Sequence, residues 1–238
     1  MKKIQRDRTP VSRNQGFTLV EMIVVIGVMS ILMTAGAIGL NGLGGKGVSS
    51  GVVTTEMLFA EARNLAIVRS ARARVLIAKD LTNTPGENLR RILVISEKLD
   101  DDGKAIKSDW ELSSRGMLLP DKVFFSQEFS KRDAAEGVDG SGPIDEMPTL
   151  PNAKALYEGS YFYYEFNTEG ICTSPGASFV IGSGVRESSS PSAKPRIIAS
   201  GKKDFGGFVI WRNGSTSIFR SPSQISNEIE NIRTGKEF

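Results

Sequence analysis

Glu21 is the residue of this sequence whose type and surroundings most clearly require a chemical explanation. It is the only ionisable side chain in the apolar run from Phe17 to Leu40, FTLVEMIVVIGVMSILMTAGAIGL. A carboxylate inside a bilayer is costly unless it is paired or lies near the interface, so such a residue is a candidate functional site. The chemistry open to it is charge pairing with a cation, and the alternative is a carboxylate tolerated among the headgroups.

The sequence lacks the side chains that most enzyme and metal sites require. It has no histidine and a single cysteine, Cys172, which excludes a Ser-His-Asp triad, a Cys-His pair, a Cys/His zinc site and an internal disulfide. Acid/base chemistry on Asp, Glu, Lys or Tyr stays open, but no pair stands at a telling spacing. The acidic run 100–103 is more typical of a solvated turn than of a calcium site. We expect no catalytic residue, metal or cofactor, and we expect Cys172 to be a buried packing residue.

The element that must hold Glu21 is the apolar run 17–40. At about 1.5 Å of rise per residue it is long enough to cross the ~30 Å hydrocarbon layer as a helix. Basic residues crowd the segment 1–16 before it, so the positive-inside rule predicts a single-pass protein with its N-terminus cytoplasmic and the rest of the chain on the other side of the membrane. An ordinary signal peptide is the competing interpretation, but it would be cut after its apolar region. The small residues available for close helix packing in lipid are Gly27, Ser30, Ala35, Gly36 and Gly39.

The charge balance does not favour a nucleic-acid partner. Charged residues make up 24% of the chain, the formal net charge is only +3, and much of that excess lies in residues 1–16. Nucleic-acid binding favours a concentrated basic patch. We therefore expect membrane lipid and other proteins as partners, and no nucleic acid.

A helix is expected to follow the apolar run, after an interruption. The segment 41–51 is rich in glycine, which disfavours helix, so we expect the helix to weaken or break there as a hinge. Helical periodicity resumes over 52–72, which predicts an amphipathic helix lying on a core. The residues expected on its buried face are Leu58, Ala62, Leu65 and Ala66.

The remaining sequence has the character of a β domain. Short β-type runs alternate with turn-rich segments from Arg74 onward, and Asn213-Gly214 predicts a hairpin. The segments 130–154 and 186–195 resemble exposed insertions, and the first could carry partner specificity. We expect an α+β fold, in which a long N-terminal helix packs on a mostly antiparallel sheet domain. The expected parts are a leader (1–16), a transmembrane helix (17–40), a glycine-rich hinge (41–51) and a globular domain (52–238), the last made of a helix (52–72), a β region (73–222) and a C-terminal tail (223–238).

The sequence where the basic segment meets the apolar run resembles the motif of a known family. The sequence QGFTLVE, residues 15–21, resembles the class III leader motif of type IV prepilins and type II secretion pseudopilins. The resemblance implies that a prepilin peptidase cuts after Gly16 and methylates the new N-terminal amine of Phe17. It also implies that Glu21 neutralises the N-terminal amine of a neighbouring subunit, and that the protein lies in a bacterial inner membrane with its C-terminal domain in the periplasm.

Weaker similarities extend into the rest of the chain. LFAEARNLAIVRSARARVLI, residues 58–77, is similar to the start of the globular domain in minor pseudopilins of the H type. The broader layout also resembles the prepilin-type cassette D proteins of verrucomicrobia. Ile38 stands where many pilins have a kinking proline, and the paired cysteines of many pilin C-terminal loops are missing. These departures favour a minor subunit over a major pilin.

We therefore predict a non-enzymatic, minor pilin-like subunit of a type II secretion or type IV pilus-like assembly, with other pilin-like subunits and prepilin peptidase as partners. The alternative is a membrane-anchored or pilus-tip β domain that binds a ligand as an adhesin. The loop 130–154 and an aromatic strand lend that alternative some support, although alternating aromatics are more often core residues. The aromatic residues concerned are Tyr157, Tyr161, Phe162, Tyr163 and Tyr164.

Overall fold

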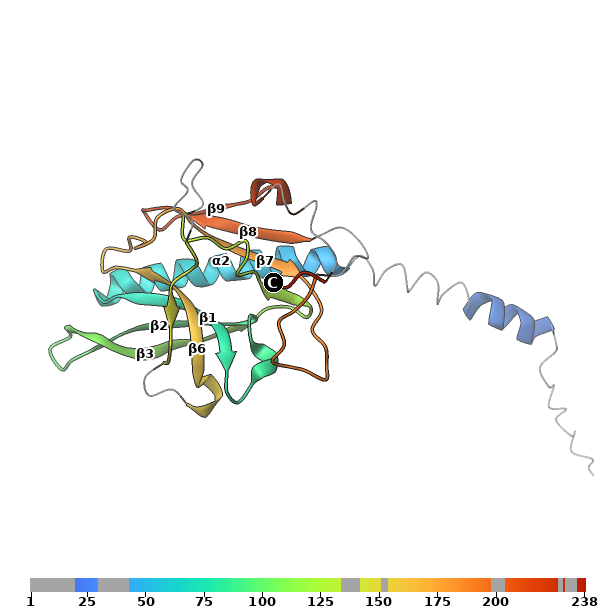
Figure 1. Ribbon diagram of the computed structural model, residues 1–238, viewed down its shortest axis with the longest axis horizontal. Helices are drawn as coiled ribbons and strands as arrows, with labels where there is room; N and C mark the ends of the chain where they lie inside the picture. The colour runs from blue at the N-terminus through green and yellow to red at the C-terminus, as the bar shows by residue number, and fades with distance from the viewer. Residues whose placement is uncertain are drawn as a thin grey trace, which may run out of the picture. The chain divides into compact units, whose positions relative to one another are not determined.

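The computed structural model describes residues 20–29, 43–133, 142–150, 154–197, 204–226, 229 and 235–238. The chain divides into two compact units, Met1–Leu43 and Gly44–Phe238, and each is described by itself. In the first unit, residues 20–29 form a helix, drawn in blue in Figure 1.

Helix α2 (Leu43–Arg69) and two antiparallel sheets make up the second unit (Figure 1). The first sheet has the strand order β3-β2-β1-β6-β5, and the second has the order β4-β7-β8-β9. The α+β prediction, with a helix packed on antiparallel sheets, is confirmed. The strands are β1 (Ala73–Leu81), β2 (Arg91–Leu99), β3 (Ala105–Leu118), β4 (Val123–Phe125), β5 (Glu146–Met147), β6 (Gly159–Phe166), β7 (Ala177–Ser183), β8 (Phe205–Ile210) and β9 (Thr216–Ile218), and short 3-10 helices are η1 (Pro85–Glu87), η2 (Ala155–Tyr157) and η3 (Pro222–Gln224).

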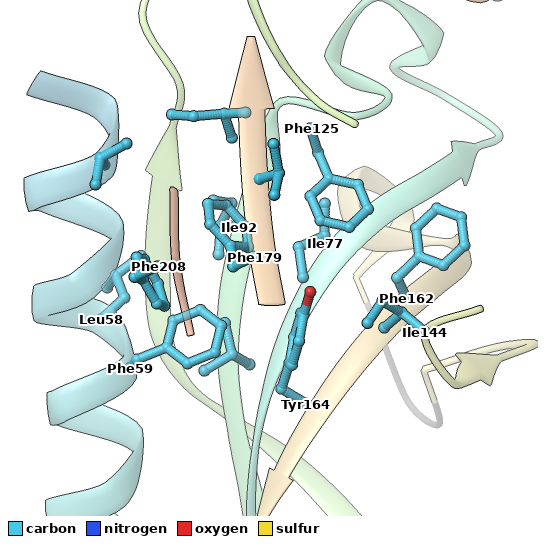
Figure 2. Packing of buried hydrophobic residues seen from close by; sticks show 14 of the residues in the cluster. Leu58, Phe59, Ile77, Ile92, Phe125, Ile144, Phe162, Tyr164, Phe179 and Phe208 are labelled. Carbon is cyan, nitrogen blue, oxygen red and sulfur yellow. The ribbon is translucent and has the colours of Figure 1, made fainter. Parts of the chain in front are cut away.

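The core lies where one face of α2 meets both sheets. Leu58, Ala62 and Ala66 are buried there, as their spacing predicts, and Leu65 packs against the same cluster. Phe59 is at the centre of the contact (Figure 2). Its ring centroid lies 5.0 to 6.3 Å from those of four other rings: Tyr164 and Phe166 on β6, Phe179 on β7 and Phe208 on β8. A single side chain therefore joins the helix to both sheets.

The predicted break over 41–51 is wrong for residues 43–51, because α2 already begins at Leu43; residues 41 and 42 lie outside the described residues. A Cβ on Gly51 would lie 2.8 Å from Cδ1 of Ile181, and a Cβ on Gly47 would lie 3.4 Å from Cγ2 of Val123. The glycines thus let the first turns of α2 approach the second sheet closely. Burial of the neighbouring apolar residues offsets the entropic cost of glycine in a helix, about 0.5–1 kcal/mol each.

Most predicted β runs are strands, and Asn213-Gly214 lies in the turn between the antiparallel pair β8 and β9. Strand β3 was not predicted. It is an edge strand whose side chains are, except for Trp110, half-exposed or exposed, so its apolar pattern is weak. One β-type run of the sequence, RIIAS at residues 196–200, is not a strand where it is described: Arg196 forms isolated bridges to Val185 and Glu237.

The end of the chain belongs to the β unit. Within the segment 223–238, predicted as a tail, the described residues 235–238 pair with the segment around Ile197: Gly235 N–H donates to Ile197 O at 2.9 Å, and Phe238 N–H donates to Pro195 O at 3.1 Å. The Phe238 ring is buried and stacks on Phe205 with centroids 5.7 Å apart. These residues therefore close one side of the core.

Candidate functional site

Glu21 lies in the helix formed by residues 20–29, which is the described part of the first unit. The large apolar side chains of this helix are between 44% and 68% exposed. A Cβ placed on Gly27 would meet no atom within 4 Å, so the helix surface there is open to a close neighbour. A continuous apolar surface of this kind is typical of a segment that enters a membrane or packs on another protein. Its exposed apolar residues are Val20, Met22, Ile23, Val24, Val25, Ile26, Val28 and Met29.

The other predicted site residues lie outside the described residues: Gly16, Phe17, Ser30, Ala35, Gly36 and Gly39. Their roles in cleavage, methylation and helix packing stay predictions. Of the predicted transmembrane run 17–40, only residues 20–29 are described. Among the described helices, none combines the length and the apolar character needed to cross a membrane.

The aromatic strand that supported a ligand-binding alternative faces inward for the most part. Tyr161, Phe162 and Tyr164 on β6 are buried, as is Tyr157 in η2. The hydroxyl of Tyr164 donates to Ser178 O at 2.7 Å, and burial raises the pKa of this phenol well above its usual range. These rings therefore belong to the core and offer no binding surface.

The described part of the predicted insertion 130–154 is largely framework. Lys131 N–H donates to Ser178 Oγ at 3.0 Å, β5 pairs with β6, and Ile144 and Leu150 are buried. This part covers core surface that would otherwise be open, so the insertion is not simply a solvated loop.

The acidic run 100–103 forms an exposed turn, as its composition predicts. Asp100 Oδ1 accepts from the backbone N–H groups of Asp102 at 3.0 Å and Lys104 at 2.7 Å, and Gly103 adopts a φ of +78°. The Asp100 carboxylate therefore stabilises the turn. Across the described ranges, no group of three or more Asp, Glu, Cys or His side chains could hold a metal ion.

Cys172 is a buried free thiol, as predicted. Its Sγ lies 3.3 Å from Ser174 O, and burial raises the pKa of the thiol to about 11. Since the thiolate is the reactive form, this residue is suited to packing and not to nucleophilic chemistry.

A charge network that the sequence did not predict lies just beyond the end of α2. Arg72 binds Glu97 through its guanidinium at 2.5 Å, and Arg74 Nε donates to Glu165 at 2.6 Å. Arg74 also lies over Trp110, with Cζ 4.2 Å from the ring centroid. Burial raises the pKa of Glu97, but the hydrogen bonds from Arg72 and from Ser108 N–H outweigh it, so that the net effect is a lowered pKa.

This network has a sequence signal that could have been used. Arg72 and Arg74 are two residues apart where β1 begins. The largely apolar strands β2 and β6 each carry one glutamate, Glu97 and Glu165. Alternation places Arg74 on the sheet face opposite α2, the face of the smaller apolar cluster that includes Leu76 and Trp110. The network ties the segment that follows α2 to strands β2 and β6 of the first sheet.

Comparison with known proteins supports the motif found at residues 15–21. Residues 11–37 match the family model described as the prokaryotic N-terminal methylation motif. Neither the curated proteins nor the solved structures gave a match. The motif implies an N-terminal membrane segment, processing by prepilin peptidase and assembly with pilins, and it marks this chain as a type IV prepilin-like protein.

Proposed function

We propose that this chain is a minor pseudopilin, of the H type, in a type II secretion or type IV pilus-like assembly. The observation that carries the proposal is the methylation motif over residues 11–37, placed around a helix whose apolar side chains are exposed. Prepilin peptidase removes residues 1–16 and methylates Phe17, and the run 17–40 holds the protein in the inner membrane with its β unit in the periplasm.

Glu21 has a defined part in this proposal. Its carboxylate pairs with the N-terminal amine of Phe17 on a neighbouring subunit, and this pairing lowers the cost of placing a carboxylate in lipid. The pair sets the axial register between subunits. Leader removal is a precondition, because the amine at position 17 does not exist in the uncut chain.

The arrangement of α2 supports a structural role. The helix begins three residues after the predicted membrane run. Its residues Val48 and Val52 pack against β8 of the second sheet, and Phe59 contacts both sheets. A rigid helix of this kind can couple a membrane anchor to a β unit. The buried aromatic strand and the absence of histidine from the chain give no support to a ligand-binding or catalytic role.

Processing is tested by intact mass and N-terminal sequencing of the membrane-extracted protein, expressed with active or inactive prepilin peptidase. The expected product begins at N-methyl-Phe17 only with the active enzyme. A chain that begins at Met1 in both cases would refute the proposal, and a cut beyond Leu40 would indicate a secreted protein.

The assembly role is tested with Glu21→Gln in the full chain. We expect this variant to be cleaved normally but to co-purify less with pilin-like subunits after cross-linking in membranes. Glu61→Gln is the matched control, since Glu61 is an exposed glutamate on α2. Equal recovery of partners by both variants would remove Glu21 from the proposed mechanism.

A further inference from the structure

The segment 235–238 is held by the β unit in the way that an extended peptide is held by a binding domain. Its backbone forms hydrogen bonds of 2.9 to 3.1 Å with residues 195–197: from Gly235 N–H to Ile197 O, from Ile197 N–H to Lys236 O and from Phe238 N–H to Pro195 O. Main-chain pairing of an extended segment with a strand-like edge is a common mode of peptide recognition. The pairing therefore fixes the position of the segment independently of its side chains.

Phe238 is the anchor of this segment. Its side chain is 5% exposed, and its ring stacks on Phe205 with centroids 5.7 Å apart and lies 6.0 Å from the Phe124 centroid. A Cβ on Gly184 would lie 2.5 Å from Cε2 of Phe238, and a Cβ on Gly182 would lie 3.0 Å from Cε1. The two glycines therefore leave the space that the aromatic ring fills.

Ion pairs match the two charged residues that precede the anchor. Lys236 Nζ lies 3.0 Å from Glu128 Oε1, and Glu237 Oε2 lies 3.7 Å from Lys194 Nζ. The four side chains are between 40% and 60% exposed, so these pairs contribute more to selectivity than to affinity. The contacts together select a basic, then an acidic, then an aromatic residue. We call the residues that make these contacts the docking site: Phe124, Glu128, Gly182, Gly184, Lys194, residues 195–197 and Phe205.

A cavity of about 440 Å³ borders the segment. It is lined by residues 236–238 together with Gln127, Glu128, Lys131, Pro143 and Lys194. Strand β7, by contrast, is paired with β4 on one side and with β8 on the other. The segment therefore has open space beside it and can leave the docking site without the separation of either sheet.

We propose that the docking site is a peptide-binding site for an extended Gly-Lys-Glu-Phe segment, and that the segment 235–238 of a second copy of this chain occupies it by exchange. An exchanged segment keeps every contact described above, which makes exchange between identical chains a low-cost route to a dimer. Five residues separate Gly235 from Ile229, which is buried. This length of chain spans at most about 22 Å, so the exchange joins β units that lie in contact.

The first test supplies the segment as a separate peptide. A chain that lacks residues 235–238 is titrated in neutral-detergent micelles with the acetylated peptide of these residues, and unfolding is followed by tryptophan fluorescence. We expect a saturable rise in melting temperature, because a ligand of the native state stabilises it. A peptide with alanine in place of Phe238 should bind about thirtyfold more weakly, as expected for the loss of a buried anchor. No response, or one that does not depend on the phenylalanine, would overturn the peptide site.

Hydrogen exchange of the intact chain tests the same site without truncation. We expect the amides of Ile197 and Phe238 to exchange by local opening, faster than those of β7 and with little dependence on urea below the unfolding transition. This measurement decides the matter where the truncated chain does not fold. Protection equal to that of β7, with the same dependence on urea, would show that the segment is a fixed part of the core and would overturn the proposal.

Cross-linking tests the second copy. Lys194→Cys and Glu237→Cys are placed on two differently tagged chains that are expressed together, and we expect a disulfide between the copies after oxidation. The double variant on one chain controls for geometry, and Lys107→Cys on β3 paired with Glu237→Cys controls for random contact, since Lys107 is also exposed. A disulfide confined to the double variant, or one formed equally with Lys107→Cys, would overturn the exchange. Neither result depends on leader cleavage, so failure of the prepilin proposal would remain distinguishable.

Discussion

Replacement of Phe59 by alanine should remove the aromatic contacts that connect α2 to both sheets. The side chain is 0% exposed and contacts four aromatic rings. Phe→Ala at a buried site costs about 3–5 kcal/mol, and the loss of several edge-to-face contacts favours the upper part of that range. A domain has only about 5–15 kcal/mol of stability in total, so the variant should be near the limit of folding at 37 °C.

Urea unfolding followed by fluorescence measures this loss in each sheet separately. Trp110 lies on β3 of the first sheet and Trp211 follows β8 of the second, and the chain has two tryptophans. Trp211→Phe and Trp110→Phe therefore give one reporter for each sheet. We expect coincident transitions in the parent chain, because the sheets share one core, and separated transitions after Phe59→Ala.

Met57→Ala is the matched control on the same helix, since Met57 is 65% exposed and its truncation should change stability by no more than about 0.5 kcal/mol. A loss below about 1.5 kcal/mol for Phe59→Ala, well under the range for buried aromatics, would refute the central role of Phe59. Separate transitions in the parent chain would refute the single core.

Three further outcomes follow from particular side chains. Gly51→Val should lower the melting temperature strongly, because even its Cβ would lie 2.8 Å from a side-chain carbon. Gly86→Ala should have a small effect, because its Cβ meets nothing within 4 Å. Similar losses for both variants in differential scanning calorimetry would contradict the close packing. Glu97 has a lowered pKa in the folded protein, so its contribution is present above the unfolded-state pKa, about 4.3, and is lost as pH falls through the folded-state value. The stability difference between the parent and Glu97→Gln should therefore shrink in acid, and a difference independent of pH in urea titrations would count against the network. Cys172, with its pKa raised to about 11, should resist iodoacetamide at pH 8 until urea unfolds the chain, and rapid labelling of the native protein by mass spectrometry would show that the thiol is accessible.

The elements whose apolar pattern is strong could be predicted from the sequence. The face of α2 that carries Ala62 and Ala66 has a 3.6-residue period, and the strands that carry Ile77 and Phe179 are short, apolar and bounded by turns. These features depend on neighbours in the sequence. The type of fold followed from them.

The features that depend on distant neighbours could not be predicted. Gly47 and Gly51 disfavour helix locally, and only the presence of β4 and β7 next to α2 makes their small size favourable. Strand β3 is specified mainly by its pairing with β2, and Gly116 is required there because a Cβ would lie 1.7 Å from Ile92 O. Such contacts join residues far apart in the chain, and one sequence does not reveal them.

In the candidate site, too, the features set by neighbours in the sequence could be predicted and those set by distant residues could not. The junction around Gly16 and Glu21 is a contiguous motif, so the sequence alone identified it, and the family model matches the same region. The charge network joins Arg72 to Glu97 and Arg74 to Glu165, residues that lie far apart in the sequence. It therefore exists only in the folded chain.

The packing of α2 has a mechanical consequence. The helix contacts the second sheet near Val48, both sheets at Phe59, and the first sheet at Arg69, whose guanidinium donates to Ser96 at 2.7 Å. A force applied to the chain at Leu43 and directed along the helix therefore loads these contacts in parallel. The Phe59 ring would have to slide past four rings at once, and the contacts could not be peeled apart one after another. Helix α2 is thus a shear connection, in which both sheets bear a pull on the start of the helix together.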